Sequence, residues 1–229
     1  MGISFLISFA LFFSCIASGT AQKNPGFDHF WLVQSWPPVY CLKYPCKNNP
    51  PLDFVLHGLW PVNSSGHTLK NSSHKFDDLE TTIENLPFIE ELKSNWPSLA
   101  STNYTSFWKH EWDNHGSGQP LDPPDYFLAA NRLTKNVDLL STLRRNGILP
   151  DGTSHPITDY VDATKDIYGY PRLTCVHRYL LKEVNLCVDR QARNFISCNH
   201  KERGSTTCGK NINFPRSVKM ANGYIWTEV

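Results

Sequence analysis

The alternation of apolar and polar positions divides the chain into strand-forming ends and a helical middle. Residues 27–36 and 54–59 are rich in aromatic and β-branched side chains, and prolines follow each run closely. This pattern is typical of strands that end in turns. From residue 173 onward, alternating runs such as 179–186 predict further strands. Residues 62–74 are rich in Ser, Asn and Gly, which indicates an exposed loop.

Helical periodicity dominates the middle of the chain. It predicts helices over residues 75–95, 104–115, 125–146 and 158–168. The third of these is the clearest, because apolar residues recur three and four positions apart, two prolines precede it and Gly147 follows it. Repeats, low-complexity linkers and charge blocks are absent from the sequence. We therefore expect one α+β domain.

Size and charge leave the class of partner open. A chain of 229 residues with 40% hydrophobic content is long enough for one large domain or two small ones with a real core. Lys and Arg total 22 against 21 acidic residues, a net charge of +1. Bulk charge therefore neither favours nor excludes a polyanionic ligand, since cations gathered in one cleft are sufficient for binding.

The amino-terminal 21 residues predict a secretory signal peptide. They carry no charged side chain, residues 3–16 are mostly apolar, and small residues precede Gln22. The alternative, a membrane anchor, is disfavoured because this apolar run is shorter than the ~20 residues that a spanning helix needs. We expect cleavage after Ala21, a mature domain of residues 22–229 and secretion of a soluble protein.

Sequons and cysteines agree with secretion. Acceptor sequences for N-glycans begin at Asn63, Asn71 and Asn103. Of seven cysteines, Cys15 is removed with the signal peptide, and an even set of six in a secreted chain predicts disulfides.

The spacing of these six cysteines suggests how they pair. Cys41 and Cys46 are close enough for a local disulfide. The other four suit nested pairing in an antiparallel meander, with Cys187–Cys198 inside Cys175–Cys208. No CxxC pair is present, which argues against a zinc ribbon or a thioredoxin-like site.

Residues 107–116 carry the most suggestive polar cluster. On a helix, His110 lies beside Asn114 and Glu111 beside His115, because residues four apart share a face. Trp108 and Trp112, which lie beside this cluster on the helix, indicate a partly buried cleft rather than a solvated face. Two histidines, a carboxylate and an amide are costly to bury without a function.

A zinc hydrolase is the main alternative, because His110-Glu111 begins like His-Glu-x-x-His. Here the next histidine, His115, comes one residue late. An offset of five places the imidazoles about 140° apart around the helix axis, which is a poor arrangement for one tetrahedral metal. We expect no metal and no cofactor.

His57 supplies the possible partner for this helix. A lone histidine on an apolar strand is more often a core residue than a catalytic one. Facing a helix with further histidines, however, it completes an acid–base pair, since a pKa near ~6.5 lets one ring be neutral and another charged.

Two segments resemble a known family. Residues 54–61 and 107–116 are similar to the two active-site signatures of the ribonuclease T2 family, His-Gly-Leu-Trp-Pro and Phe-Trp-x-His-Glu-Trp-x-Lys-His-Gly. The similarity continues through residues 34–41, 181–187 and 208–215, and so spans the mature chain. It implies a monomeric α+β domain in which a central antiparallel sheet packs against several helices.

The resemblance also implies roles in metal-free cleavage of single-stranded RNA. His115 would be the general base on the ribose 2′-OH, and His57 the acid that protonates the 5′-oxygen and releases a 2′,3′-cyclic phosphate. His110 would hold the phosphate, and Glu111 would stabilise the phosphorane. The implied substrate-binding residues are Ser35, Trp60, Ser98, Leu99, Phe107 and Asn114. DNA, which lacks the 2′-OH, would not be a substrate.

The chain departs from the family pattern in two places. Asn114 stands where the family has a lysine, and losing that cation should slow turnover by roughly 10- to 1000-fold. Gly118 stands where the family commonly has a cysteine, and the partner cysteine in the loop after Trp60 is missing too. Losing such a bridge typically costs about 2–5 kcal/mol, and the loop should be more mobile.

Three biological roles fit these features. The favoured one is the stylar determinant of self-incompatibility, which would act with a protein recognition partner. A defence or nutrient-scavenging ribonuclease is the alternative, and the near-neutral charge speaks slightly for it. Asn114 keeps a third role open, namely a weakly active ribonuclease fold that serves in recognition or storage.

Overall fold

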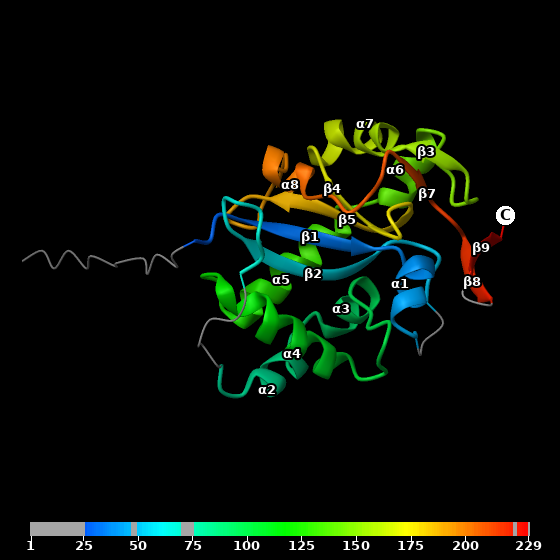
Figure 1. Cartoon of the computed structure of the whole chain (residues 1–229). Coiled ribbons are helices and arrows are strands. Elements are labelled where there is room, and N and C mark those ends of the chain that lie inside the picture. The colour runs from blue at the N-terminus through cyan, green and yellow to red at the C-terminus, as the bar shows by residue number, and fades with distance from the viewer. Residues whose placement is uncertain (1–25, 47–49, 70–75, 222–223, 229) are drawn as a thin grey trace, which may run out of the picture.

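The computed structural model describes residues 26–46, 50–69, 76–221 and 224–228 (Figure 1). Its main sheet has the strand order β2-β1-β5-β7-β3, with β4 and β6 also paired to β5. These strands are β1 (His29–Ser35), β2 (Val55–Val62), β3 (Ser154–Pro156), β4 (Arg172–Val176), β5 (Leu180–Val188), β6 (Phe195–Ile196) and β7 (Asn211–Asn213). A separate hairpin consists of β8 (Ser217–Ala221) and β9 (Tyr224–Glu228).

Helices cover both sides of the sheet. They are α1 (Pro37–Lys43), α2 (Leu79–Glu84), α3 (Ile89–Asn95), α4 (Tyr104–Asn114), α5 (Pro123–Lys135), α6 (Leu139–Arg145), α7 (Ile157–Tyr168) and α8 (His200–Gly204). In Figure 1, α2 to α5 gather on one side of β1 and β2, whereas α7 and α8 lie on the other side. Within the described residues, no helix combines the length and apolarity needed to cross a bilayer.

The central strand β1 is buried on both faces. Phe30 and Leu32 belong to the large core shared with the helices, whereas Trp31 and Val33 pack in a smaller cluster with Cys187. Because successive strand residues point to opposite faces, one strand supplies both layers. The predicted α+β domain is confirmed. The sheet is antiparallel except where β5 pairs parallel with β7.

The predicted turn at Pro37 and the predicted helix over residues 125–146 were wrong in detail. The expected turn at Pro37 is the start of α1, since proline is tolerated in the first helical turn, where no N–H partner is needed. The expected helix over residues 125–146 is two helices, α5 and α6. The break occurs at Asp138, whose side chain accepts from the Ser141 N–H and whose own N–H donates to the Tyr168 hydroxyl.

The region 75–95 was also expected to be one helical stretch. It contains α2 and α3, which are separated by a segment with Pro87. Proline lacks the N–H that a continuous helix would use, so the chain turns there. The short helix α8 was not predicted.

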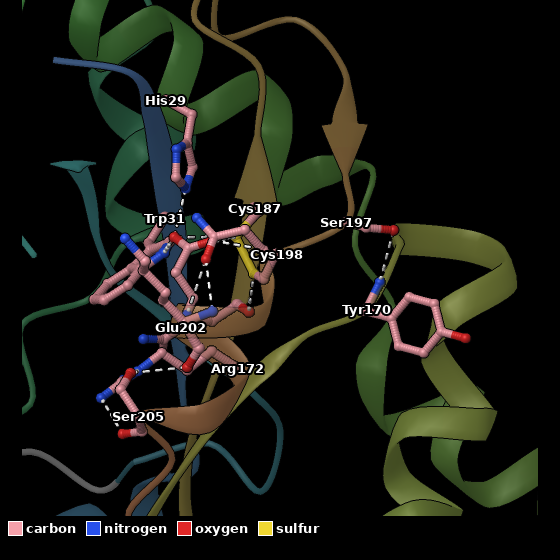
Figure 2. Close-up of a disulfide and its surroundings, with 12 residues drawn as sticks. His29, Trp31, Tyr170, Arg172, Cys187, Ser197, Cys198, Glu202 and Ser205 are labelled. Carbon is pink, nitrogen blue, oxygen red and sulfur yellow. Dashed lines mark hydrogen bonds and ion pairs between the residues drawn. A yellow bond between two sulfur atoms is a disulfide. The ribbon is translucent and has the colours of Figure 1, made fainter. Parts of the chain in front are cut away.

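The three predicted disulfides, Cys41–Cys46, Cys175–Cys208 and Cys187–Cys198, are all present. Cys187–Cys198 ties β5 to the segment that leads into α8, as Figure 2 shows.

At the position of the absent family disulfide, Gly118 packs against Leu69, where an added Cβ would lie 3.2 Å from the Leu69 Cβ. The Leu69 N–H donates to the Pro61 carbonyl at 2.8 Å, so this end of the loop is fixed to β2. Residues 70–75, including the sequon at Asn71, lie outside the described residues. So does the predicted signal peptide.

Candidate active site

A β-bulge positions His57. In the pairing of β1 with β2, Val33 lies opposite Gly58 and Gln34 opposite Leu56, so His57 is the residue that the register skips. Bulges re-aim a side chain and are frequent beside active sites. The His57 ring points toward β5, with Nδ1 3.0 Å from Oε1 of Glu183.

Glu111 reaches the same place from α4. Its side chain is buried, and Oε2 accepts a hydrogen bond of 2.9 Å from the indole N–H of Trp60. Oε1 lies 3.8 Å from Nε2 of His57. A Cβ at Gly58 would collide with both the Glu111 carboxylate and the Trp60 ring, so the close approach of α4 to β2 requires glycine there.

Trp60 lies between the two predicted catalytic histidines. Its ring stacks on His115, with centroids 4.4 Å apart and planes inclined by 22°, and meets His57 edge-on at 5.0 Å. His115 is the C-cap of α4, where its backbone N–H donates to the Glu111 carbonyl. The structure thus brings His57, Glu111 and His115 together around one indole.

His110 and Asn114 face outward. Both side chains are exposed, and the Asn114 amide donates to the His110 carbonyl at 2.8 Å and lies 3.1 Å from Nδ1 of the ring. When the amide donates to Nδ1, the proton of a neutral ring sits on Nε2. The expected polar quartet is therefore split, with Glu111 buried and the His110–Asn114 pair on the surface.

Burial and charge set the protonation of this cluster. Burial opposes a charged His57, but the hydrogen bond to Glu183 and the charge of Glu111 outweigh it, so the pKa of His57 is raised. For Glu111, burial opposes the charged carboxylate and so raises the pKa of this group. For Glu183, burial is outweighed by the hydrogen bond and charge of His57 and by the charge of Lys182, which lower its pKa to about 2.

A pocket opens beside His57, which forms part of its lining. Four of the predicted substrate-binding residues line it, namely Ser35, Ser98, Leu99 and Phe107. They come from β1, from the segment between α3 and α4, and from α4 itself. Trp60 and Asn114, the other two predictions, are not part of its lining.

Glu183 and Lys182 were not among the residues predicted from the sequence. Glu183 accepts from His57, although it is 126 residues away in the chain. The available signal was an adjacent acid and base inside the otherwise largely apolar run 180–188. Tyr40 of α1, whose ring meets the His57 ring edge-on at 5.5 Å, was not predicted either.

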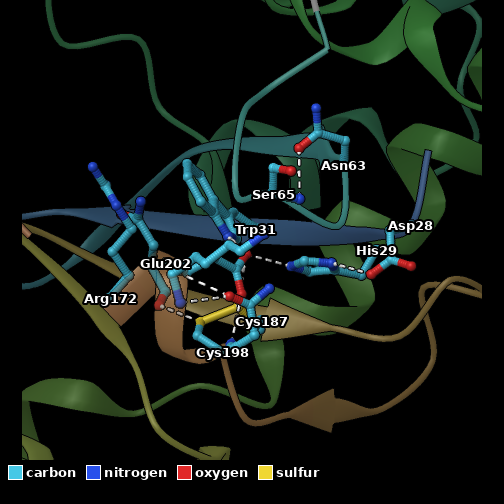
Figure 3. Close-up of polar contacts among 12 residues, drawn as sticks. Asp28, His29, Trp31, Asn63, Ser65, Arg172, Cys187, Cys198 and Glu202 are labelled. Carbon is cyan, nitrogen blue, oxygen red and sulfur yellow. Dashed lines mark hydrogen bonds and ion pairs between the residues drawn. A yellow bond between two sulfur atoms is a disulfide. The ribbon is translucent and has the colours of Figure 1, made fainter. Parts of the chain in front are cut away.

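Potential metal ligands lie elsewhere. Among the described residues, one group offers three ligand atoms within 4.8 Å of one another: His29, Cys187 and Glu202. The Cys187 sulfur is already bonded to Cys198, and His29 and Glu202 are hydrogen-bonded to each other at 2.6 Å. Figure 3 shows this group, with His29 from β1, Cys187 from β5 and Glu202 from α8, and with the disulfide from Cys187 to Cys198.

Two predicted glycan acceptors are described. Asn63 is partly exposed, and Asn103 is exposed at the start of α4. The Asn103 Oδ1 accepts a hydrogen bond of 2.9 Å from the Ser106 N–H, as an N-cap. Its amide nitrogen, the atom that carries an N-glycan, is not used in this bond.

The family comparison agrees with the motifs. A family model described as the Ribonuclease T2 family matches residues 27–198. Ribonuclease 1 of Arabidopsis thaliana is 35% identical over 226 residues, which covers 92% of this chain and 95% of that protein. Ribonuclease S-7 of Nicotiana alata is 33% identical and covers 82% of this chain and 89% of its own length.

Two further relatives come from Solanum lycopersicum, and both are 34% identical. One is named extracellular ribonuclease LE and covers 88% of this chain and 91% of itself. The other is named intracellular ribonuclease LX and covers 82% and 84%. Among solved structures, a mutant of RNase MC1 in complex with 5′-GMP superposes with a TM-score of 0.70 at 31% identity. That match covers 81% of this chain and 98% of the other.

Proposed function

Because the chain belongs to the ribonuclease T2 family and is a T2-type endoribonuclease, we propose that it cleaves single-stranded RNA with His57 as general acid and His115 as general base. The observation that carries this assignment is the arrangement of both rings around Trp60, whose indole also donates to buried Glu111, with a pocket beside His57.

The proposed reaction begins at the ribose 2′-OH. His115 removes its proton, the 2′-oxygen attacks phosphorus, and the bond from phosphorus to the 5′-oxygen breaks as His57 protonates the leaving oxygen. The product is a 2′,3′-cyclic phosphate, which water can open when the two histidines exchange roles. The raised pKa of His57 supports its role, because the acid must be protonated at the start.

Glu111 and His110 would stabilise the phosphorane from two sides. Glu111 is a buried carboxyl group near Nε2 of His57, where developing charge is poorly screened and hydrogen bonds have a large effect. His110 is exposed, and in the tautomer that accepts from Asn114 its Nε2–H is left to bind a phosphate oxygen.

The pocket lined by Phe107, Ser98 and Leu99 would hold a base, since aromatic faces bind unpaired bases without strict sequence readout. The 5′-GMP complex of RNase MC1 supports nucleotide binding in this fold. For Trp60 we propose a different task from base stacking. His115 covers one face of the Trp60 ring, and the indole N–H of Trp60 donates to Glu111. Trp60 would therefore position the catalytic groups.

The test is a cleavage assay with purified protein, RNA and EDTA. We expect cleavage that survives chelation, oligonucleotides that end in 2′,3′-cyclic phosphate, and no cleavage of DNA. His57→Ala and His115→Ala proteins serve as controls and should be inactive. Activity that disappears with EDTA and returns with zinc would contradict the metal-free mechanism.

We further propose that the protein is secreted and glycosylated and that it serves in self-incompatibility. The relatives named Ribonuclease S-7 and extracellular ribonuclease LE support this, whereas LX is named as intracellular. The exposure of Asn103 supports glycosylation. Protein from the extracellular fraction should begin at Gln22 and lose mass on treatment with a glycosidase. Styles of transgenic plants that express the protein should reject pollen of one self-incompatibility specificity.

A recognition or storage role remains the second candidate, and Asn114 is the observation that favours it. If purified protein is inert toward RNA while it folds normally, this second role replaces catalysis.

A further inference from the structure

We propose that Glu183 is a positioning residue that fixes the His57 ring with Nε2 toward the substrate, and that Lys182 limits how strongly Glu183 holds it. This inference rests on the proposed role of His57 as the general acid.

The contact between Glu183 and His57 defines the orientation of the ring. A carboxylate accepts hydrogen bonds, so the 3.0 Å contact to Oε1 requires that Nδ1 carry a hydrogen. Nε2 is then the atom presented toward Glu111 and the adjoining pocket. Glu183 is buried and does not line the pocket, so it acts through His57 rather than on the substrate.

A second bulge brings Lys182 to the same carboxylate. Successive residues of a strand normally point to opposite faces. In the pairing of β4 with β5, however, Thr174 lies opposite Glu183 and Cys175 opposite Leu181, so Lys182 is skipped. Its ammonium lies 3.1 Å from Oε1 of Glu183, the same oxygen that accepts from His57.

One oxygen therefore lies within hydrogen-bond distance of two nitrogen donors, Nδ1 of His57 and the Lys182 ammonium. The Ser35 hydroxyl, from β1, lies 3.5 Å from it as well. The Lys182 ammonium also lies 5.8 Å from the ring centroids of Tyr40 and Tyr44, which hold it beside α1. Since a carboxylate oxygen has a limited capacity to accept, the share taken by Lys182 weakens the bond to His57.

The charged and titratable groups around His57 come from three elements. Glu183 and Lys182 belong to β5, Glu111 to α4 and Tyr40 to α1. Burial first, and then nearby carboxylates, raise the pKa of Tyr40 to about 12, so its hydroxyl stays neutral near pH 7. The two carboxylates favour the charged form of His57, whereas Lys182 disfavours it.

Opposite shifts in the pH profile follow for the two neighbours. The acid must be protonated, so the pKa of His57 sets the alkaline limb of kcat against pH, and the base His115 sets the acidic limb. Glu183→Gln keeps a hydrogen-bond acceptor but removes the charge, and should move the alkaline limb down by about one pH unit, a roughly tenfold loss above the limb. Lys182→Gln should move it up.

The experiment measures kcat and KM against pH for the wild type, Glu183→Gln, Lys182→Gln and Glu183→Leu. Glu183→Leu removes the acceptor as well, and should lower kcat about 100-fold at every pH because the ring loses its orientation. KM should change little in all three. Glu202→Gln is the matched control, another buried carboxylate made into an amide, and should leave both limbs in place.

The outcomes separate this inference from the proposed function. If His57→Ala keeps wild-type activity, the assignment of His57 as the acid fails. If His57→Ala is inactive but neither neighbour variant moves the alkaline limb, the role of Glu183 is overturned. Should Glu183→Gln fail to fold, which a thermal melt reveals, Lys182→Gln alone decides, because Lys182 is only partly buried.

Discussion

Two histidine–carboxylate clusters lie at opposite ends of the central strand β1, one with His29 at its start and one with Glu183 opposite Ser35 at its end. His57 has one nitrogen bound, with Nδ1 against Glu183, while Nε2 remains 3.8 Å from Glu111. His29 has both nitrogens bound, with Nδ1 3.0 Å from Asp28 and Nε2 2.6 Å from Glu202. The pKa of each histidine is raised for the same reason, as carboxylate partners outweigh burial. The pKa shifts of the two histidines have the same direction, whereas the contacts of Nε2 differ: it is 2.6 Å from Glu202 in His29 and 3.8 Å from Glu111 in His57.

The surroundings of Glu202 explain why the second cluster is closed. The Trp31 indole donates to it at 2.6 Å, and the Asn199 N–H does the same in the capping box that starts α8 (Figure 2). Arg172 covers the Trp31 ring at 4.8 Å. The Glu202 carboxylate thus accepts from the two rings of β1, His29 and Trp31, and from its own helix, and these bonds join α8 to β1. We propose the His57 cluster as the catalytic one because its Nε2 lies no closer than 3.8 Å to Glu111 and its ring lines a pocket, whereas a raised pKa is common to both histidines.

The largest expected contrast is in turnover. His57→Ala should lower kcat by about 100- to 10,000-fold, because it removes the proposed general acid. At temperatures where the variant is folded, His29→Ala should change kcat by less than about twofold. The hydrogen bonds of the His29 ring go to Asp28 and Glu202, and neither residue lines the pocket. Steady-state cleavage of a dinucleotide measures both. An equal loss of kcat in the two variants would mean that the clusters are functionally coupled.

The reverse contrast should appear in stability. Breaking a buried ion pair on one side leaves the other charge without a partner, and typically costs about 3–5 kcal/mol. Glu202→Ala should therefore lower the unfolding free energy by about that amount in urea titrations. Asn114→Ala, on the exposed face of the active site, should change it by less than about 1 kcal/mol.

The exposed position of Asn114, beside His110, should also accept a new positively charged side chain. Asn114→Lys should raise kcat, by roughly 10-fold or more, because its ammonium would project near His110 and stabilise charge on the phosphorane. KM should change less than kcat. His115→Ala should abolish cleavage in both backgrounds. If the wild type is inert and Asn114→Lys adds nothing, the recognition or storage role is adopted instead.

The smallest effect is the pH dependence of stability. His29 has a raised pKa when folded, so its contribution is complete below its unfolded pKa of ~6.5 and is lost as pH rises through the folded value. The pKa of Glu202 is lowered, as hydrogen bonds outweigh burial, so its contribution is present above the ordinary glutamate pKa of 4.5 and is lost as pH falls through the folded value.

Thermal melts should therefore show the greatest difference between wild type and His29→Leu at pH values between about 4.5 and 6.5. The same comparison with His57→Leu separates the contribution of the active site. A difference that does not vary with pH would show that His29 stabilises by packing alone.

Local patterns predicted what is local. Glu111 and His115 share one helix, and His57 stands in a short motif, so spacing was enough to group them. The pocket residues could be named from resemblance, and the fold places four of them together. Glu183 escaped notice because its link to His57 depends on sheet register and on a bulge, and neither leaves a periodic trace in the sequence.

The fold shows the same limit. The apolar periodicity of residues 125–146 continues in phase across the break, so the pattern suggested one helix, whereas the cap at Asp138 and the distant Tyr168 hydroxyl divide it. The adjacent prolines Pro37 and Pro38 are compatible both with a turn and with the start of a helix. The packing of α1 beside the active site favours the second.

The cap at Asn103 has a consequence for genetics. The side chain that would carry a glycan also begins α4, the helix that carries Glu111 and His115. An Asn103→Gln allele, made to ask what the sugar does, would remove a helix cap with an effect of ~1 kcal/mol at the same time. Any change in phenotype would then confuse loss of carbohydrate with a loosened helix. Thr105→Val separates the two, because it destroys the sequon and leaves the capping carbonyl of Asn103 in place.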